Sequence, residues 1–370
     1  MTTIKPSIFR DRSAIVMENK LAALTVYPGG GHIASYVLKT NPINPLWEPV
    51  WPGIEPSVRE IGSQDDYGSE REGVMLSSIA GHNLCCDVFG EHSDGEKAVG
   101  LDYHSEAGMV HWSVVSADPE QGILIMEASL PHTAVTIDRE FRLAPDATQV
   151  VVEQTELNNV GFERAVGTAQ HATLGHDFLG SVERPTLFAC NADKGQTWPE
   201  PNNEYPYSFK VDEPFDYPNI PSLDGSVQDW RCYPRHEPTG DLATLRIRPD
   251  AQHAWVSAYQ PQHELVLAYA WEREAYPWML TWEENKSRDH KPWNGKSLTR
   301  GLEFSSYPFA TSRRANVNLG ELHDTPTFAW LDAYAERQTT FAFGLFQVDE
   351  EQSKAPDVSA TDEWQLQLAW

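Results

Sequence analysis

Apolar and polar residues alternate along most of this chain, and glycine, proline, asparagine and aspartate interrupt the alternation. A period of two is typical of half-buried β-strands, because successive side chains of a strand point to opposite faces. Residues 13–38 therefore predict three short strands, with turns at 18–19 and 28–31. Residues 132–161 predict two longer strands joined by a turn at 144–147, where a proline pre-sets the backbone angle φ.

The rest of the sequence also favours an all-β protein. No segment keeps a helical period of apolar residues for longer than about three turns. All-β domains of roughly 200–250 residues are common, and no repeat, linker or low-complexity segment divides the 370 residues here. We therefore predict one domain over residues 1–370, built as a large antiparallel β-sandwich, with a core that needs no disulfide or metal to hold it.

Charge and cysteine content narrow the classes of partner. The formal net charge is −26, from 54 acidic and 28 basic residues, which disfavours binding to nucleic acid or to a membrane surface. Neither a secretory signal nor an apolar stretch of about 18 residues is recognisable. The cysteines have no CxxC spacing and predict free thiols of a cytoplasmic protein: Cys85, Cys86, Cys190 and Cys232.

Two long segments, residues 41–64 and 194–235, do not read as strands. Both are rich in proline and in tryptophan or tyrosine. Long loops in a compact domain are uncommon and are usually functional, and aromatic side chains suit the flat apolar faces of sugars. Simple packing of the aromatics against the loops is an equal alternative. Residues 349–361 read as an acidic excursion.

Polar residues stand out in three stretches that otherwise read as strands. In residues 100–112, His104 and Glu106 are two apart, so both would face the same side of a strand. Gln170 and His171 lie where a second predicted strand leaves the core. A lone histidine in a strand is more often structural than functional, so neither stretch decides the function alone.

The third stretch, residues 299–309, places Glu303 between Leu302 and Phe304, after Gly301. Burial of a carboxylate by such neighbours raises its pKa toward neutrality, which suits a general acid or base. A lone glutamate there is usually the outward phase of an alternating strand. The ordered series of two histidines and a glutamate, with strands between them, makes a shared site more plausible than any one residue does.

With this series the chain resembles a known family, the aldose 1-epimerases or galactose mutarotases. Residues 23–39 (ALTVYPGGGHIASYVLK) are similar to the opening strands of that family, and 156–161 (ELNNVG) to the end of a two-strand unit. GLDYHSE at 100–106 is similar to the segment whose histidine binds the sugar. QHATLG at 170–175 and GLEFSSYPF at 301–309 resemble the strands with the acid histidine and the base glutamate.

The resemblance implies a galactose mutarotase-like supersandwich and an enzyme that interconverts the anomers of a small-molecule sugar. It implies that Glu303 is the base, that His171 is the acid, and that His104 holds a hydroxyl or the ring oxygen. Gln170 stands where the family commonly has an asparagine beside the acid histidine. No cofactor is expected, because the chain has no GxGxxG after a strand and no Walker motif.

Other features depart from the family and favour a divergent member. Ser105 follows the sugar-binding histidine where the family has glycine, and the candidates for the family's sugar-binding aspartate are Asp229 and Asp241. Residues 277–297 form an elaborated loop before the base. We expect no metal site, because His171 and His176 are five residues apart, which suits neither a helix nor one strand face without a bend.

The elaborated loop supplies further candidates for binding. Trp282 and Arg288, with the nearby Trp278 and Trp293, could line a sugar pocket or form a packed lid with surface charges. A phosphorylated sugar would require converging cations, and the sequence offers four in this region: Arg288, Lys291, Lys296 and Arg300.

Two other classes of function stay open. A non-catalytic carbohydrate-binding or sugar-sensing module could keep the sandwich without the chemistry, because a fold does not fix a function. An accessory domain of a polysaccharide lyase or glycoside hydrolase is the third reading. Glycoside hydrolysis would require two carboxylates roughly 5–9.5 Å apart, and only Glu303 is convincing in the sequence.

Overall fold

The computed structural model describes residues 1–56, 66–68, 70–201, 204–236 and 238–370. Within these residues the chain forms mainly antiparallel β-sheet, so the predicted all-β class is confirmed. The helices are short: α1 (Glu70–Leu76), α2 (Asp94–Ala98), the 3-10 helix η3 (Glu106–Gly108) and α3 (Arg313–Leu319). No helix in the described part is long and apolar enough to cross a membrane.

The larger sheet has eleven strands among the described residues, all paired antiparallel. In spatial order they are β1 (Thr3–Phe9), β2 (Arg12–Glu18), β3 (Ala22–Val26), β4 (Ile33–Leu38), β5 (His82–Cys86), β11 (Thr168–Leu174), β22 (Leu298–Ser305), β21 (Trp278–Asn285), β18 (Thr239–Ile247), β13 (Ala192–Thr197) and β14 (Pro214–Asp216). Strands far apart in sequence thus become neighbours, and β11 lies between β5 and β22.

The second sheet has nine strands in the same part of the chain. Their order is β17 (Cys232–Tyr233), β12 (Thr186–Cys190), β19 (His253–Gln260), β20 (Leu265–Glu272), β26 (Glu336–Gln347), β9 (Gln149–Asn158), β8 (Val135–Arg142), β7 (Ile123–Leu130) and β6 (Ser113–Asp118). Small ladders join β10 (Arg164–Ala165) to β25 (Trp330–Leu331), β15 (Asn219–Pro221) to β16 (Val227–Asp229), β23 (Glu321–Leu322) to β24 (Thr325–Pro326) and β27 (Asp357–Ala360) to β28 (Leu366–Ala369).

The two sheets share one hydrophobic core. Strand alternation builds it: in β8 every second side chain is buried, beginning with Val135. Aromatic rings join the layers, as where Tyr36 of β4 meets Phe343 of β26 edge-on at 5.1 Å between ring centroids. The core therefore lies between one face of each sheet, and α1 and several loops lie over part of the outer face of the larger sheet.

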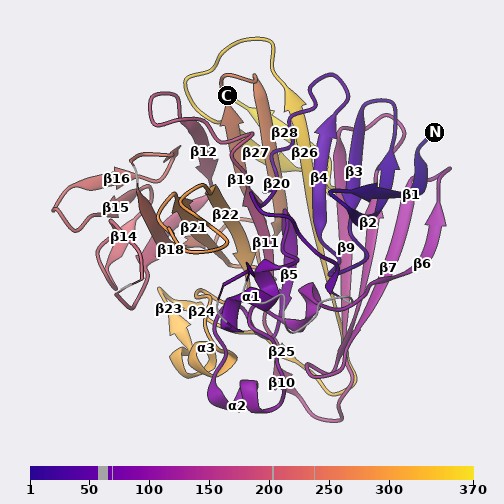
Figure 1. Cartoon of the computed structure of the whole chain (residues 1–370), viewed down its shortest axis with the longest axis horizontal. Coiled ribbons are helices and arrows are strands. Elements are labelled where there is room, and N and C mark those ends of the chain that lie inside the picture. Colours follow the sequence, from indigo (N-terminus) through magenta and orange to yellow (C-terminus); the bar gives the residue numbers. More distant parts are fainter. Residues whose placement is uncertain (57–65, 69, 202–203, 237) are drawn as a thin grey trace.

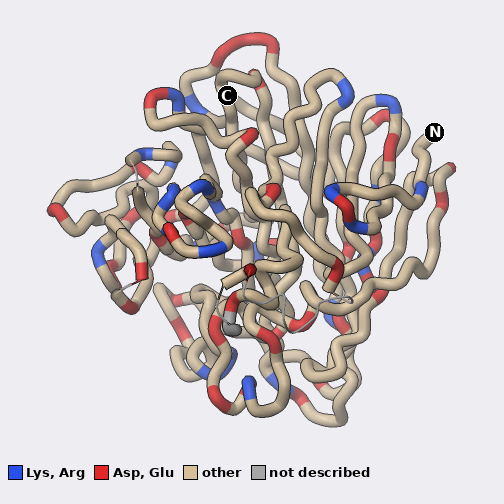
Figure 2. The backbone as a smooth tube through the Cα atoms, viewed as in Figure 1, with Lys and Arg blue, Asp and Glu red and all other residues tan. Residues whose placement is uncertain are grey.

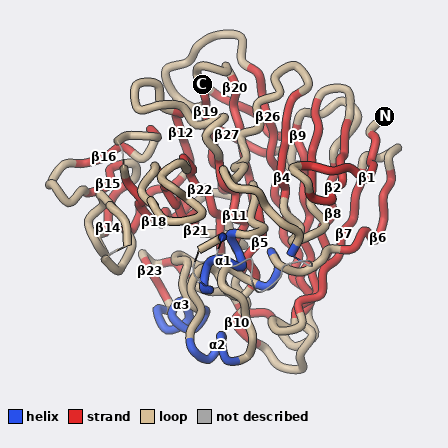
Figure 3. The backbone as a smooth tube through the Cα atoms, viewed as in Figure 1, coloured by secondary structure: helices blue, strands red, loops and turns tan. Residues whose placement is uncertain are grey.

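Helices and loops lie together at one end of the strands. Figures 1 and 3 show α2 and α3 at the lower end of the view and α1 above them, near the labels of β5 and β11. In the view of Figure 2, acidic residues lie on many loops and strands.

Several predicted segments can be compared with this fold. The strands expected in 13–38 and 132–161 are confirmed as β2, β3, β4, β8 and β9. In the segment 41–64, residues 57–64 lie outside the described residues. The prediction that 194–235 lacks strands is wrong, because β14 to β17 lie there, and β27 lies in the acidic excursion 349–361.

The strand predicted for residues 100–112 is also wrong. His104 and Ser105 have φ angles of 60° and 82°, which a strand cannot accommodate. The Ser105 hydroxyl instead accepts a hydrogen bond from the Ala107 amide and begins η3. Glu106 is buried, and its carboxylate accepts hydrogen bonds from the backbone amides of two residues after β7.

Candidate functional site

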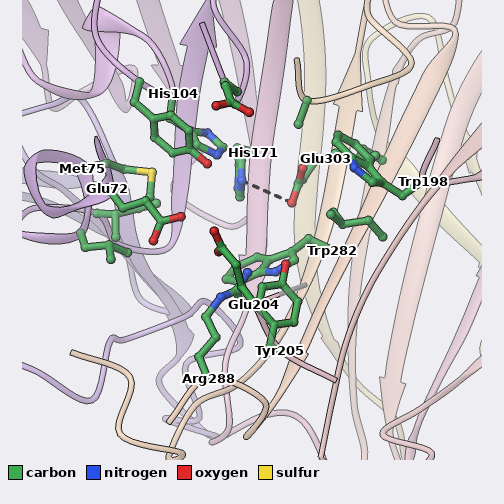
Figure 4. A pocket seen from close by; sticks show the side chains of 18 of the residues that line it. Glu72, Met75, His104, His171, Trp198, Glu204, Tyr205, Trp282, Arg288 and Glu303 are labelled. Carbon is green, nitrogen blue, oxygen red and sulfur yellow. Dashed lines mark ion pairs between the residues drawn. The ribbon is translucent and has the colours of Figure 1, made fainter. Parts of the chain in front are cut away.

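A cavity of about 360 Å³ lies on the outer face of the larger sheet. Its floor comes from β11, β22, β21 and β18, and α1 forms part of its wall together with several loops. Figure 4 shows His171 and Glu303 side by side at this floor, with Glu72, Glu204 and Arg288 around them. The cavity therefore brings together residues from distant parts of the chain.

His171 and Glu303 are direct register partners on the neighbouring strands β11 and β22. Register partners point to the same face of a sheet, and Nε2 of His171 lies 3.3 Å from Oε1 of Glu303. Both side chains are almost entirely buried, with 5% and 1% exposed. An imidazole and a carboxylate separated by 132 positions in sequence thus become one unit that faces the cavity.

Burial acts on the two groups in opposite directions. It lowers the pKa of His171 to about 4 and raises the pKa of Glu303 well above the ordinary value of a glutamate. Removal from water disfavours the charged form of each group. Burial therefore reverses the ordinary order of the two proton affinities and favours the uncharged pair, in which Glu303 holds the proton and His171 is neutral.

Neighbouring residues hold this pair in place. Oγ1 of Thr173 lies 3.0 Å from Nδ1 of His171 on the same face of β11. Gly301 lies two residues before Glu303, and a Cβ added to this glycine would come within 2.0 Å of Oε1 of Glu303. The carboxylate of Glu303 therefore occupies space that is free only because Gly301 has no side chain.

His104 approaches the pair from the loop before η3. Its ring centroid lies 5.2 Å from that of His171, and its Nδ1 lies 3.4 Å from Sγ of Cys85. Burial lowers the pKa of His104 and raises that of the Cys85 thiol, so the imidazole stays neutral and the thiol keeps its proton. A thiol that donates to Nδ1 leaves the ring proton on Nε2, where His104 can donate to a ligand.

Aromatic residues form much of the wall. Trp47 stacks on Trp293 at 5.8 Å, and Trp282 meets both rings edge-on. Nη1 of Arg288 lies 2.6 Å from Glu284, and the guanidinium lies 4.0 Å above the ring centroid of Tyr205. Trp282 and Arg288, both expected from the sequence, thus line the cavity.

Gln170 and Arg300, also expected to bind substrate, require correction because they are not among the residues that line the cavity. Gln170 is the neighbour of His171 on a strand, so its side chain takes the opposite face and accepts a hydrogen bond from Arg139 at 2.6 Å. Arg300 is fully buried, contacts Glu283 at 3.3 Å and lies 4.3 Å above the Trp230 ring. Because side chains alternate along a strand, Gln170 must point away from the face of His171, and Arg300 away from the face of Glu303.

The remaining candidates also lie outside the cavity. Asp241 accepts hydrogen bonds from Ser208 and Phe209, and Asp229 pairs with Arg231. Lys291 pairs with Asp66 on the surface. A phosphate site built from Arg288, Lys291, Lys296 and Arg300 is therefore wrong, because only Arg288 of these lines the cavity. The described residues contain no group of three or more metal-binding side chains.

Sequence reasoning missed several lining residues. Trp47, Trp198, Glu200 and Glu204 come from the two long segments that their aromatic content singled out, whereas Glu72 comes from α1. The length and the aromatic content of those two segments indicated a functional region. It could not select residues, because no periodic backbone fixes the direction of a loop side chain.

Comparison with known proteins gives a likeness of structure. No protein-family model and no curated protein matches the sequence. A Klebsiella pneumoniae structure described as a candidate aldose 1-epimerase has a TM-score of 0.63 at 11% identity, covering 92% of this chain and 83% of its own. A galactose mutarotase related enzyme from Lactobacillus acidophilus has a TM-score of 0.58 at 12% identity, covering 92% and 99%.

A galactose mutarotase-like protein from Clostridium acetobutylicum gives a similar result, with a TM-score of 0.58 at 11% identity and coverage of 94% and 99%. Each likeness extends over nearly the whole chain, although few residues are identical. The chain therefore has the galactose mutarotase-like fold with a divergent sequence.

Proposed function

We propose that this protein interconverts the α and β anomers of a sugar by opening and reclosing its hemiacetal ring. The observation that carries the proposal is the His171–Glu303 pair, with 3.3 Å between Nε2 and Oε1 at the floor of an aromatic-lined cavity. Ring opening needs a base at the C1 hydroxyl and an acid at the ring oxygen. The fold likeness to mutarotase-like proteins is consistent with this chemistry but shows only the fold.

The pair reacts in its ionised form, with its one proton on His171, and in the opening step Glu303 takes the proton of the C1 hydroxyl. The bond between C1 and the ring oxygen breaks, C1 becomes an aldehyde carbon, and protonated His171 gives its Nε2 proton to the ring oxygen. Rotation about the C1–C2 bond then presents the other face of the aldehyde, and the reverse transfers close the ring. Each cycle leaves the pair with the one proton with which it began.

The environment of the pair suits such reversible transfer. Because burial lowers the pKa of His171 and raises that of Glu303, the favoured resting form is the uncharged pair with its proton on Glu303, and the ionised form arises when that proton moves to Nε2 of His171 across the 3.3 Å contact. Each positioned proton transfer contributes roughly 10²–10⁴-fold to a rate. Nε2 of His104 would donate a hydrogen bond to a sugar oxygen and fix the ring against the pair.

Two alternative functions have support in the same cavity. A sugar-binding module would use its aromatic walls, but it would not require the His171–Glu303 pair. A glycoside hydrolase would use two carboxylates, and Glu72 and Glu204 also line the cavity. The first alternative predicts binding without anomer exchange, and the second predicts release of a reducing sugar from a glycoside.

The test is polarimetry or NMR exchange on a panel of free aldoses. The native protein should accelerate equilibration of at least one aldose, and Glu303→Gln or His171→Ala should remove most of the acceleration. His176→Ala is a matched control, because the His176 side chain is 52% exposed, pairs with Asp177 and is not among the described residues that line the cavity. Equal rates for the native protein and both site variants would refute the proposal.

A further inference from the structure

The described residues that line the cavity carry far more negative than positive charge. Five glutamates line the cavity: Glu72, Glu91, Glu200, Glu204 and Glu303. The single lining cation within the described residues is Arg288, and its charge is matched by Glu284, 2.6 Å away. Acidic residues outnumber basic ones by five to one in this lining, compared with 54 to 28 in the whole sequence.

The described lining is also rich in hydrogen-bond acceptors. Ionised carboxylates only accept hydrogen bonds, and the donors beside them are Arg288 and the rings of histidine, tryptophan and tyrosine, with no asparagine, glutamine, serine, threonine or lysine among the described lining residues. Glu72, Glu91 and Glu204 also interact within the protein, so the imbalance concerns their charge and acceptor character. A ligand that brings donors complements this lining, whereas a phosphate or carboxylate brings further acceptors.

Glu303 supplies a separate indication of a ligand. Its side chain is 1% exposed and faces the cavity floor. Apart from the contact with His171, its Oε1 has no hydrogen-bond partner among the described residues. A buried acceptor without a donor is costly, so a ligand group with an N–H or O–H would satisfy it.

The aromatic wall already holds one cation. The guanidinium carbon of Arg288 lies 4.0 Å from the ring centroid of Tyr205 and 4.9 Å from that of Trp293. A cation within about 6 Å of an aromatic face is attracted by the ring quadrupole. Trp198 and Tyr103 also line the cavity and offer the same kind of surface to a bound ligand.

We infer that the sugar bound by this cavity carries a positively charged amino group and that phosphorylated or acidic sugars are excluded. An ammonium group only donates hydrogen bonds, gains from nearby carboxylates and suits an aromatic wall. The inference rests on the proposed sugar site and defines its substrate class. Figure 4 shows the carboxylates of Glu72 and Glu204 turned into the cavity, where they can meet such a group.

Calorimetry with methyl glycosides separates this inference from the proposed reaction, because a methyl glycoside cannot open its ring. The probes are the methyl glycosides of glucosamine, of N-acetylglucosamine and of glucose, and glucose 6-phosphate. We expect the amine to bind roughly tenfold more tightly than its N-acetyl and hydroxyl counterparts. The preference should fall with added salt and above about pH 8, where an amine of this kind loses its proton.

Charge-removing variants locate the effect. Glu204→Gln and Glu72→Gln keep the shape of the side chain, and each should lower the preference for the amine severalfold. Glu120→Gln removes the same charge from an exposed turn between β6 and β7, outside the cavity lining, and should leave the preference intact.

Equal or tighter binding of the N-acetyl glycoside, tighter binding of glucose 6-phosphate, or no binding of any glycoside would overturn the inference. Its failure is distinct from failure of the proposed reaction. Loss of the amine preference would leave anomer exchange of neutral aldoses in place. Conversely, absence of exchange with every aldose would leave a measured amine preference in place.

Discussion

Gly301 provides a sharp test of how the site is positioned. A Cβ at residue 301 would lie 2.0 Å from Oε1 of Glu303, whereas real Cβ contacts shorter than 3.0 Å are essentially never seen. In Gly301→Ala the carboxylate must therefore move by at least about 1 Å from the position in which it lies 3.3 Å from His171. A misplacement of about 1 Å can reduce a rate by roughly 10²-fold, which corresponds to about 2.7 kcal/mol of activation free energy.

The fold should tolerate this substitution. The φ angle of Gly301 is not positive, and the nearest atom is the end of a flexible side chain, so the clash can be relieved without moving the backbone. We expect thermal unfolding close to that of the native protein and a rate of anomer exchange, measured by NMR, that is lower by roughly 10²-fold.

The matched control is Gly95→Ala in α2, where an added Cβ meets nothing closer than 4.0 Å. This variant should keep the native rate. A Gly301→Ala protein that is folded and also keeps the native rate would refute the assignment of Glu303 as a positioned catalytic group.

Three further predictions concern the same site. At acid pH the exchange rate, corrected for buffer catalysis, should fall only near the lowered pKa of His171, about 4, because the pair there gains a second proton. At alkaline pH the rate should fall only above the raised pKa of Glu303. A fall of the rate near the ordinary pKa of histidine would contradict this prediction. Cys85→Ala should lower kcat/KM on the order of tenfold, and nitrogen-15 NMR should show the proton of the His104 ring moving toward Nδ1. Cys85→Ser should keep Nε2 of His104 protonated. An unchanged tautomer of His104 in Cys85→Ala would refute the role of the thiol. Trp282→Ala should raise KM more than it lowers kcat, and Trp282→Phe should restore most of the affinity; equal KM values for Trp282→Ala and the native protein would show that this ring does not contact the sugar.

Strand positions could be predicted well from the sequence because alternation has a physical cause. The period of two is enough to identify β2, β3, β4, β8 and β9 in the amino-acid sequence. The same period fixes which side chains share a face. Applied consistently, it places Gln170 opposite to His171 and Arg300 opposite to Glu303. Residue type alone favours a binding role for Gln170 and Arg300, but strand phase decides where their side chains point.

Other parts of the site could not be predicted because they depend on contacts between distant segments. The pairing of β11 with β22 makes His171 and Glu303 neighbours, and no local pattern encodes that pairing. The positive φ angles of His104 and Ser105 turn an apparently strand-like stretch into a loop. Glu204 enters the cavity from a loop, where no period fixes the direction of a side chain, and Glu72 enters from α1, a helix of 7 residues that is too short for its period to stand out in the sequence.

The central claim is that His171 and Glu303 act as one proton-transfer unit on a bound sugar. A double-mutant cycle of anomer-exchange rates tests it most directly, with His171→Ala, Glu303→Gln and the combined variant measured on the same aldose. Groups that act as a unit lose their effect together, so the combined variant should be about as slow as the slower single variant. Losses that add fully in free energy, or single variants that keep the native rate, would contradict the claim.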